Sequence, residues 1–249
     1  MLWDFTKEKF DIIIQAGQSN AAGDGGGNVD RPYIPTNEIL HLENDFTIGV
    51  ARERIKDNYI FSHFGLTFAK KYIEEGRLAE GRRVLIIRSA VGGTGFSDHR
   101  WGMTDDLYLR MMELTRTALQ LGSENRIVAF LWHQGETDAI NHMAEEEYYG
   151  HLLTLVNSVR NEFKSDIPFV CGDFVQDWKS VNEEICKPII AAQRKLVNNI
   201  SNAEFVETDG LLSNNQYNNF DCDSIHFCRP AQYELGYRYY DAFIKAEQK

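Results

Sequence analysis

Five short apolar runs recur along the chain, each separated from the next by enough residues to form a helix. The runs are nearly continuous rather than alternating, which is typical of strands buried on both faces of a parallel sheet. We therefore predict five strands, at 11–16, 83–88, 127–132, 167–172 and 203–208.

The segments between these runs carry apolar residues three and four positions apart, which is the pattern of an amphipathic helix. Leu152, Leu155, Val156 and Val159 share one face in this way. Because such segments alternate with the strands, the pattern favours a three-layer α/β/α sandwich, a doubly wound fold in a single domain over 1–249. The helices are predicted at 62–75, 105–121, 145–163, 182–198 and 230–245.

One connection, residues 24–60, is much longer than the others and is rich in glycine, asparagine and charge. Long connections in compact domains often have a function. Two interpretations stay open: the segment forms a wall of a substrate cleft, or it is an excursion without such a role.

The composition, with 43% hydrophobic and 25% charged residues among 249, is that of a globular protein. A net charge of −11 disfavours nucleic acid and anionic membranes as partners. No apolar run approaches the roughly 20 residues that cross a bilayer. The N-terminus does not have the pattern of a secretory signal, and the four cysteines form no C-x-x-C pair. We therefore expect a reducing, cytoplasmic location.

Polar and glycine-rich segments follow the first three strands, where ligands bind in sheets of this kind. Within them, Ser19 is a candidate nucleophile, which requires a base to accept its proton. His226, in the loop before the last helix, is the candidate base, and Asp223, three residues earlier, can orient its ring. Asp221 is a competing partner for His226.

An oxyanion formed during acyl transfer requires hydrogen-bond donors. The candidates are the backbone N–H of Ser19, an N–H of the loop "VGGTG" at 91–95, and the side-chain amide of Gln134. Within the loop, Gly92 and Gly93 are alternatives, and we prefer Gly93.

Other roles are possible for the same residues. Ser19 alone is most often a helix cap, and so are acidic residues such as Glu136 after a strand. The glycines at 25–27 do not belong to a phosphate-binding motif. Cys222 and Cys228 flank His226, but their spacing matches no standard zinc site. We expect neither a metal nor an organic cofactor.

Three motifs, "GQSNAAG" (17–23), "WHQGETDA" (132–139) and "DSIHF" (223–227), with "AVGGTGFSDHRW" (90–101) as a fourth, resemble the SGNH (GDSL-type) hydrolase superfamily. The resemblance is closest to its sialate O-acetylesterase and acetylxylan esterase-like branch, carbohydrate esterase family six. It implies a flavodoxin-like fold, with Ser19 as nucleophile, His226 as base and Asp223 as its partner. It also implies an oxyanion hole from Ser19, Gly93 and Gln134.

Supporting roles follow from the same resemblance. Gln18 stands where the wider superfamily has aspartate, and Gln134 stands where it has the oxyanion asparagine; both changes are typical of the branch. Gln18 and Asn20 are expected to support the site. Glu136 is expected to orient either Gln134 or the nucleophile loop.

The expected reaction is hydrolysis of O-acetyl esters on a small or oligomeric carbohydrate. Arg100 and Trp101 are the expected substrate-binding residues, and His99, Trp178 and Tyr217 also fall on loops where they could contact a sugar ring. Burial of the tryptophans for packing is the alternative. Two other functions stay under consideration: a non-catalytic carbohydrate-binding module, and a lipid esterase or thioesterase.

Overall fold

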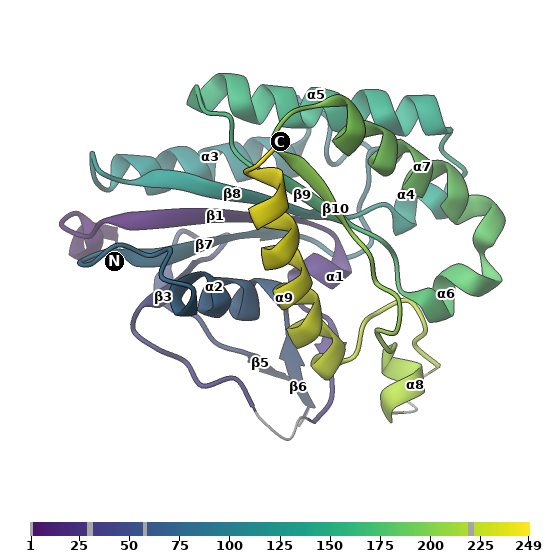
Figure 1. Ribbon diagram of the computed structural model, residues 1–249, viewed down its shortest axis with the longest axis horizontal. Coiled ribbons are helices and arrows are strands. Elements are labelled where there is room, and N and C mark those ends of the chain that lie inside the picture. The colour runs from purple at the N-terminus through teal and green to yellow at the C-terminus, as the bar shows by residue number, and fades with distance from the viewer. Residues whose placement is uncertain (1, 29–31, 57–58, 219–221) are drawn as a thin grey trace.

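The central layer of the molecule is a sheet built from the predicted apolar runs (Figure 1). The computed structural model describes residues 2–28, 32–56, 59–218 and 222–249. Numbered in chain order, the five predicted strands lie 2-1-3-4-5 and pair in parallel, which is the flavodoxin-like arrangement. All five are confirmed, as β1 (Phe10–Gly17), β7 (Arg83–Ala90), β8 (Arg126–His133), β9 (Phe169–Gly172) and β10 (Ala203–Val206).

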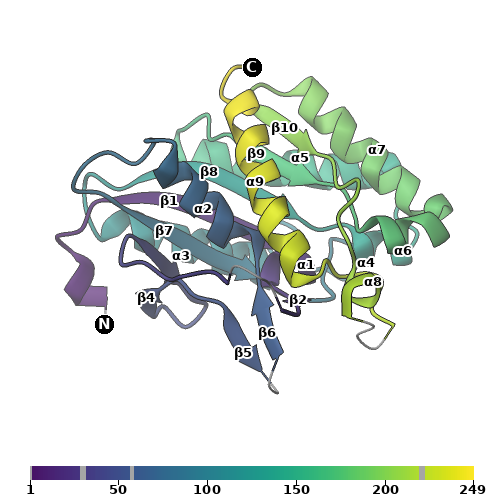
Figure 2. The same ribbon diagram turned by 60° about the horizontal axis from the view of Figure 1, so that its bottom comes forward.

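The sheet has seven strands, so the prediction of five was wrong in number. The two additional strands come from the long connection: β3 (Ile39–Leu42) pairs in parallel with β7, and β4 (Ile48–Val50) pairs antiparallel with β3. The same connection also contributes a small antiparallel sheet, seen projecting in Figure 2, of β2 (Gly25–Gly26), β6 (Tyr59–Ser62) and β5 (Arg54–Lys56). The strands of this small sheet have two to four residues, and β5 is exposed throughout, so they lack a readable apolar run.

Helices cover both faces of the sheet, and all five predicted helices are confirmed. α2 (Phe64–Glu74) and α9 (Arg229–Ala246) pack on one face (Figure 1). α3 (Asp106–Gln120), α5 (Glu145–Phe163) and α7 (Glu183–Asn199) pack on the other. Both helical layers pack against β1. Ile12 and Ile14 face the layer of α3, α5 and α7, whereas Ile13 faces the layer of α2 and α9.

Short helices that the spacing did not predict follow three of the strands. α1 (Ser19–Ala22) follows β1, α4 (Glu136–Ile140) follows β8, and α6 (Gln176–Val181) follows β9. The remaining short elements are a 3₁₀ helix, η1 (Leu2–Phe5), and α8 (Asn214–Asn218). In the sheet, β1 lies between β7 and β8, so the order in which the chain adds strands reverses direction at β1. A ligand-binding crevice is expected at such a switch point, and here it lies beside α1.

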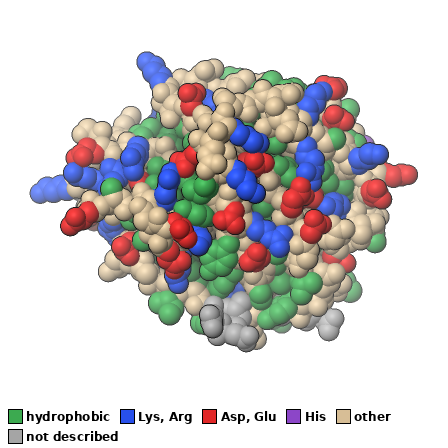
Figure 3. Space-filling view, in the orientation of Figure 1, with side chains coloured by type: hydrophobic (Ala, Val, Ile, Leu, Met, Phe, Trp, Pro, Cys, Tyr) green, Lys and Arg blue, Asp and Glu red, His purple; other side chains and the backbone are tan. Residues whose placement is uncertain are grey.

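The surface seen in Figure 3 carries Lys and Arg side chains interspersed with Asp and Glu over α2 and α9, rather than one basic area. In the described part of the chain, no helix combines the length and apolar character that a bilayer crossing requires.

Candidate active site

Ser19 is the first residue of α1, directly after the central strand. The turn is tight, because Gln18 N donates to His133 O at 3.0 Å. At Gly17, where φ is +130°, a Cβ atom would lie 2.1 Å from the same carbonyl oxygen, so only glycine fits there. The close pairing of β1 with β8 thus determines where Ser19 lies, and its side chain is largely buried.

His226 is held by Asp223, with Nδ1 at 2.9 Å from each carboxylate oxygen. Burial lowers the pKa of His226, but the hydrogen bond to Asp223 and the charges of Asp223, Asp24 and Glu136 outweigh it and raise the pKa above 6.5. Burial raises the pKa of Asp223, but hydrogen bonds from His226 and Asn214 prevail and lower it. The competing partner, Asp221, lies outside the described residues.

Asn20 connects the nucleophile turn to the histidine loop. Its Nδ2 donates to Ile225 O at 3.0 Å, and its Oδ1 accepts from Phe227 N at 3.1 Å. Ile225 and Phe227 flank His226, and Asn20 follows Ser19, so the bridge joins the two segments that carry the candidate catalytic residues. Figures 1 and 2 agree in placing α1 beside the beginning of α9.

Glu136 lies beneath this bridge and is completely buried. Its Oε1 accepts from Asn20 Nδ2 at 2.8 Å, so its contact is with the nucleophile turn. No described residue hydrogen-bonds to its Oε2, and burial raises its pKa. Of the two expected targets of Glu136, the structure places it against the nucleophile loop and not against Gln134.

The glycine-rich loop passes beside the nucleophile. A Cβ atom built on Gly92 would lie 3.6 Å from Ser19 Cβ, and one built on Gly93 would meet no atom within 4 Å. The loop is secured from below by Asp138, whose carboxylate accepts from Phe96 N at 3.1 Å and Ser97 N at 2.7 Å. The glycine loop is therefore held in place beside Ser19, with open space beside the Gly93 α-carbon.

Gln134 has different contacts from those expected of an oxyanion donor. It is completely buried, and its Nε2 lies 2.8 Å from Asp138 Oδ2 and 3.2 Å from both Thr94 O and Gln18 Oε1. An amide nitrogen has two hydrogens, and three internal acceptors already compete for them. In this structure Gln134 ties the glycine loop to α4, and its role as an oxyanion donor stays a prediction.

Gln18 also has a structural role beside Gln134. Its Oε1 also accepts from Gly135 N at 3.3 Å and from Thr137 N at 3.2 Å. These are backbone donors at the beginning of α4, which have no acceptor inside the helix. Gln18 thereby joins the nucleophile turn to α4.

Asn214, which the sequence did not single out, orients the carboxylate of the candidate triad. Its Nδ2 donates to Asp223 Oδ2 at 2.8 Å and to Asp24 O at 3.1 Å, and its Oδ1 accepts from Gly26 N at 3.1 Å. Asp24 in turn accepts from Arg54 NH2 at 2.8 Å. No motif marks these residues, because they come from separate parts of the chain and meet only in the fold.

Of the two expected substrate-binding residues, Trp101 is buried and Arg100 forms an ion pair. Trp101 is 1% exposed, and its Nε1 donates to Thr94 Oγ1 at 3.0 Å, so it supports the glycine loop instead of stacking on a ring. Arg100 is paired with Asp106 through two hydrogen bonds of 2.7 and 2.9 Å. Trp178 is also buried, whereas His99 and Tyr217 are exposed.

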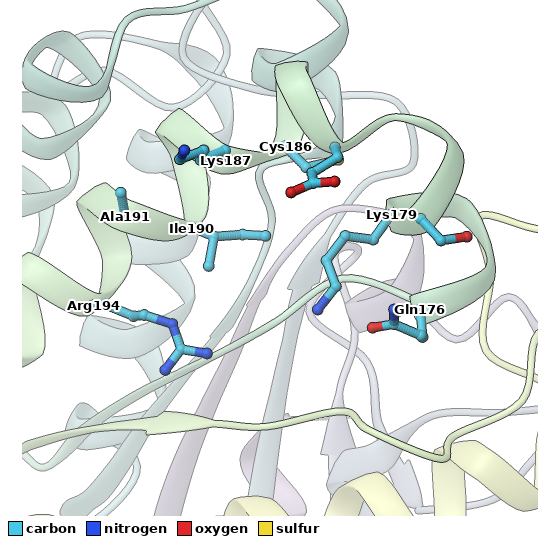
Figure 4. A pocket seen from close by; sticks show the side chains of 9 residues that line it. Gln176, Lys179, Cys186, Lys187, Ile190, Ala191 and Arg194 are labelled. Atoms are coloured by element: carbon cyan, nitrogen blue, oxygen red, sulfur yellow. The ribbon is translucent and has the colours of Figure 1, made fainter.

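The cavity in Figure 4, about 600 Å³ between α6 and α7, contains none of the candidate catalytic residues. Two cationic side chains that line it already form ion pairs, Lys179 with the buried Asp173 and Arg194 with Glu207. Within the described ranges, no three His, Cys, Asp or Glu side chains come together in a way that could hold a metal ion.

Known proteins share this architecture. A probable carbohydrate esterase of Arabidopsis thaliana, At4g34215, is 24% identical over 253 residues, covering 94% of this chain and 90% of that protein. Among solved structures, NanS superposes with a TM-score of 0.80 at 20% identity, covering 97% of this chain and 98% of its own. XAC1771, a carbohydrate acetylesterase from Xanthomonas citri, gives a TM-score of 0.66 at 15% identity, covering 96% of this chain and 57% of its own.

At these identities the structural likeness shows the fold alone. The family follows from the sequence itself, because residues 9–245 match the model described as carbohydrate esterase, sialic acid-specific acetylesterase. The chain therefore belongs to this family of carbohydrate esterases and is a carboxylic ester hydrolase.

Proposed function

We propose that this protein hydrolyses O-acetyl esters on a carbohydrate through an acetyl-serine intermediate, with Ser19 as nucleophile. The observation that carries the proposal is the bridge made by Asn20, which follows Ser19 and hydrogen-bonds the backbone on both sides of His226. A serine hydroxyl becomes a useful nucleophile only beside a base, and this bridge supports such an arrangement of Ser19 and His226.

In the first step, Ser19 Oγ attacks the acetyl carbonyl carbon while His226 Nε2 takes the hydroxyl proton. Asp223 is hydrogen-bonded to Nδ1 at 2.9 Å, which favours the tautomer with its lone pair on Nε2. The same carboxylate stabilises the imidazolium that forms. The carbonyl electron pair moves onto oxygen and gives a tetrahedral oxyanion.

The oxyanion is held by the backbone N–H groups of Ser19 and Gly93. Each such donor contributes roughly 3 kcal/mol to the stability of the transition state. Asp138 and Gln134 act indirectly, because they hold the glycine loop in place through hydrogen bonds to the backbone of Phe96, Ser97 and Thr94.

The tetrahedral intermediate then collapses. The carbonyl re-forms, the bond to the sugar oxygen breaks, and His226 gives its proton to that oxygen. A water molecule, deprotonated by the same histidine, attacks the acetyl-serine and releases acetate and the free Ser19 hydroxyl. The sequence is a two-step acyl transfer to water.

Two findings support an acetylated sugar as substrate. The family description names sialic acid acetylesterases, and XAC1771 is described as a carbohydrate acetylesterase. O-acetylated sialic acids are therefore the first substrates to test, ahead of acetylated xylo-oligosaccharides. The same family membership argues against a non-catalytic module and against a lipid esterase.

The proposal is tested with Ser19→Ala. We expect kcat on both p-nitrophenyl acetate and an O-acetylated sialic acid to fall by at least about a thousandfold, because no other group replaces the nucleophile. Ser180→Ala, which removes an exposed hydroxyl from α6, is the matched control. Acid-quenched wild-type enzyme should carry acetyl on the peptide containing Ser19. Ser19→Ala turnover close to that of the control would remove Ser19 from its role.

A further inference from the structure

An ion pair to which the mechanism assigns no bond-making or proton-transfer role lies next to the nucleophile. A Cβ atom built on Gly92 would lie 3.6 Å from Ser19 Cβ and 3.7 Å from Asp24 Oδ2. Ser19 and Asp24 therefore border the same small space above the glycine loop. The other carboxylate oxygen, Asp24 Oδ1, accepts from Arg54 NH2 at 2.8 Å.

Both side chains are accessible to a ligand, with 34% of Asp24 and 47% of Arg54 exposed. No described residue donates a hydrogen bond to Asp24 Oδ2, and none accepts from Nε or NH1 of Arg54. The pair thus presents an unused acceptor beside unused donors.

The pair is held firmly by its surroundings. The guanidinium carbon of Arg54 lies 5.2 Å from the Phe61 ring centroid, and Asn214 Nδ2 donates to the backbone oxygen of Asp24 at 3.1 Å. Arg54 also lines a cavity of about 380 Å³, with Arg52, Glu53 and Arg88 among its other walls. There is therefore open space beside Arg54.

An acceptor and a donor fixed side by side match the hydroxyl groups of a sugar, because each hydroxyl can both donate and accept. We propose that Asp24 and Arg54 form a hydroxyl-binding subsite that selects a polyhydroxylated leaving group for hydrolysis at Ser19. This inference rests on the proposed function. It assigns Asp24 Oδ2 to accept from one hydroxyl, and the Arg54 guanidinium to donate to a neighbouring one.

The test compares two esters that share the acetyl group and differ in the leaving group. An O-acetylated sialic acid offers hydroxyls to the subsite, whereas p-nitrophenyl acetate offers none. In Arg54→Gln and in Asp24→Asn, we expect the ratio of kcat/KM for the sugar ester to that for the aryl ester to fall ten- to a hundredfold. That range is typical for the loss of a hydrogen bond to a charged group.

Because the two side chains act as one unit, the double variant should lose little more than the worse single variant. The matched control is Arg116→Gln: Arg116 is 46% exposed and is paired with Glu162 at 2.7 Å on the helical layer. Its ratio should equal that of the wild type. Arg54→Lys keeps the charge without the planar fork and should give an intermediate ratio.

The charge of Asp24 raises the pKa of His226, so Asp24→Asn also moves the pH profile toward lower pH. Rates are therefore compared on the high-pH plateau of each variant's own pH profile, where the rate no longer changes with pH. An unchanged ratio in both single variants would overturn the subsite while leaving the esterase proposal standing. A wild-type enzyme that hydrolyses neither ester would overturn the proposed function itself, and the subsite with it.

Discussion

His226 is the residue whose protonation state decides when the proposed chemistry can occur. It must be neutral to take a proton from Ser19, and its carboxylate neighbours favour the charged ring. The same carboxylates stabilise the imidazolium in the transition state. The same arrangement of charges therefore has two effects. It raises the pKa of His226, and it stabilises the imidazolium that forms during catalysis.

We expect kcat/KM to rise with pH along a limb whose midpoint lies above 6.5, because the pKa of His226 is raised and the reactive form is the deprotonated one. Asp223→Asn should shift this limb to lower pH and reduce kcat about a thousandfold or more. Initial rates on p-nitrophenyl acetate from about pH 5 to 9 measure both effects. A flat profile in the wild type would contradict a histidine base.

At the scale of elements, the site depends on side-chain hydrogen bonds that connect loops following different strands. Asn20 joins the turn after β1 to the loop before α9, and Gln18 joins the same turn to α4. Asp138 joins α4 to the glycine loop after β7. These buried side chains explain how short loops at one sheet edge keep a common geometry.

Asp138→Ala tests the joint beneath the glycine loop. We expect kcat to fall about ten- to a hundredfold with a smaller change in KM, because the loop donors lose their alignment in the transition state. The free energy of unfolding should fall by about 2 kcal/mol, since Phe96 N and Ser97 N lose their acceptor. Urea unfolding and steady-state kinetics measure the two effects. Asp106→Asn, which affects only an exposed pair, is the control, and an equal kcat in both variants would contradict the assigned role.

At the scale of the whole molecule, the sheet brings together residues that are far apart in the chain. The contact between Asn20 and Phe227 spans 207 positions. β1 occupies the centre of the sheet and α9 packs beside α2 across it, so α1 and the loop that precedes α9 meet at the switch point (Figure 1). The site therefore exists only when the complete sandwich has formed.

The opposite end of β1 is held by Asp11, which is completely buried and hydrogen-bonded by Arg82, Arg126 and Tyr72. Asp11→Asn should reduce the free energy of unfolding near neutral pH by about 3 kcal/mol, because it removes the buried negative charge that pairs with Arg82 and Arg126. Urea unfolding measures the loss.

The same substitution has a defined pH dependence. Burial raises the pKa of Asp11, but hydrogen bonds from Arg126, Tyr72 and Arg82 prevail and lower it below 3.8. Its contribution is therefore complete above the unfolded pKa and is lost as pH falls through the folded pKa. The wild type and Asp11→Asn should converge in stability toward low pH, and a difference that persists undiminished in acid would contradict this explanation.

The sequence by itself determined the elements of this protein and the residue types of its site. Continuous apolar runs and three-to-four spacing report burial of local faces, so the five main strands and five main helices could be read directly. The motifs around Ser19 and His226 indicated the hydrolase family, because the residue types that such chemistry requires occur within short stretches of chain.

Only the tertiary structure decided the partners of these residues. No local signal marks the pairing of the two further strands, the inward-facing amide of Gln134, the burial of Trp101 or the meeting of Asp24, Arg54 and Asn214. Each depends on contacts between segments that are distant in the chain. Local periodicity records which face of an element is buried, and it contains no information about which distant side chain lies against that face.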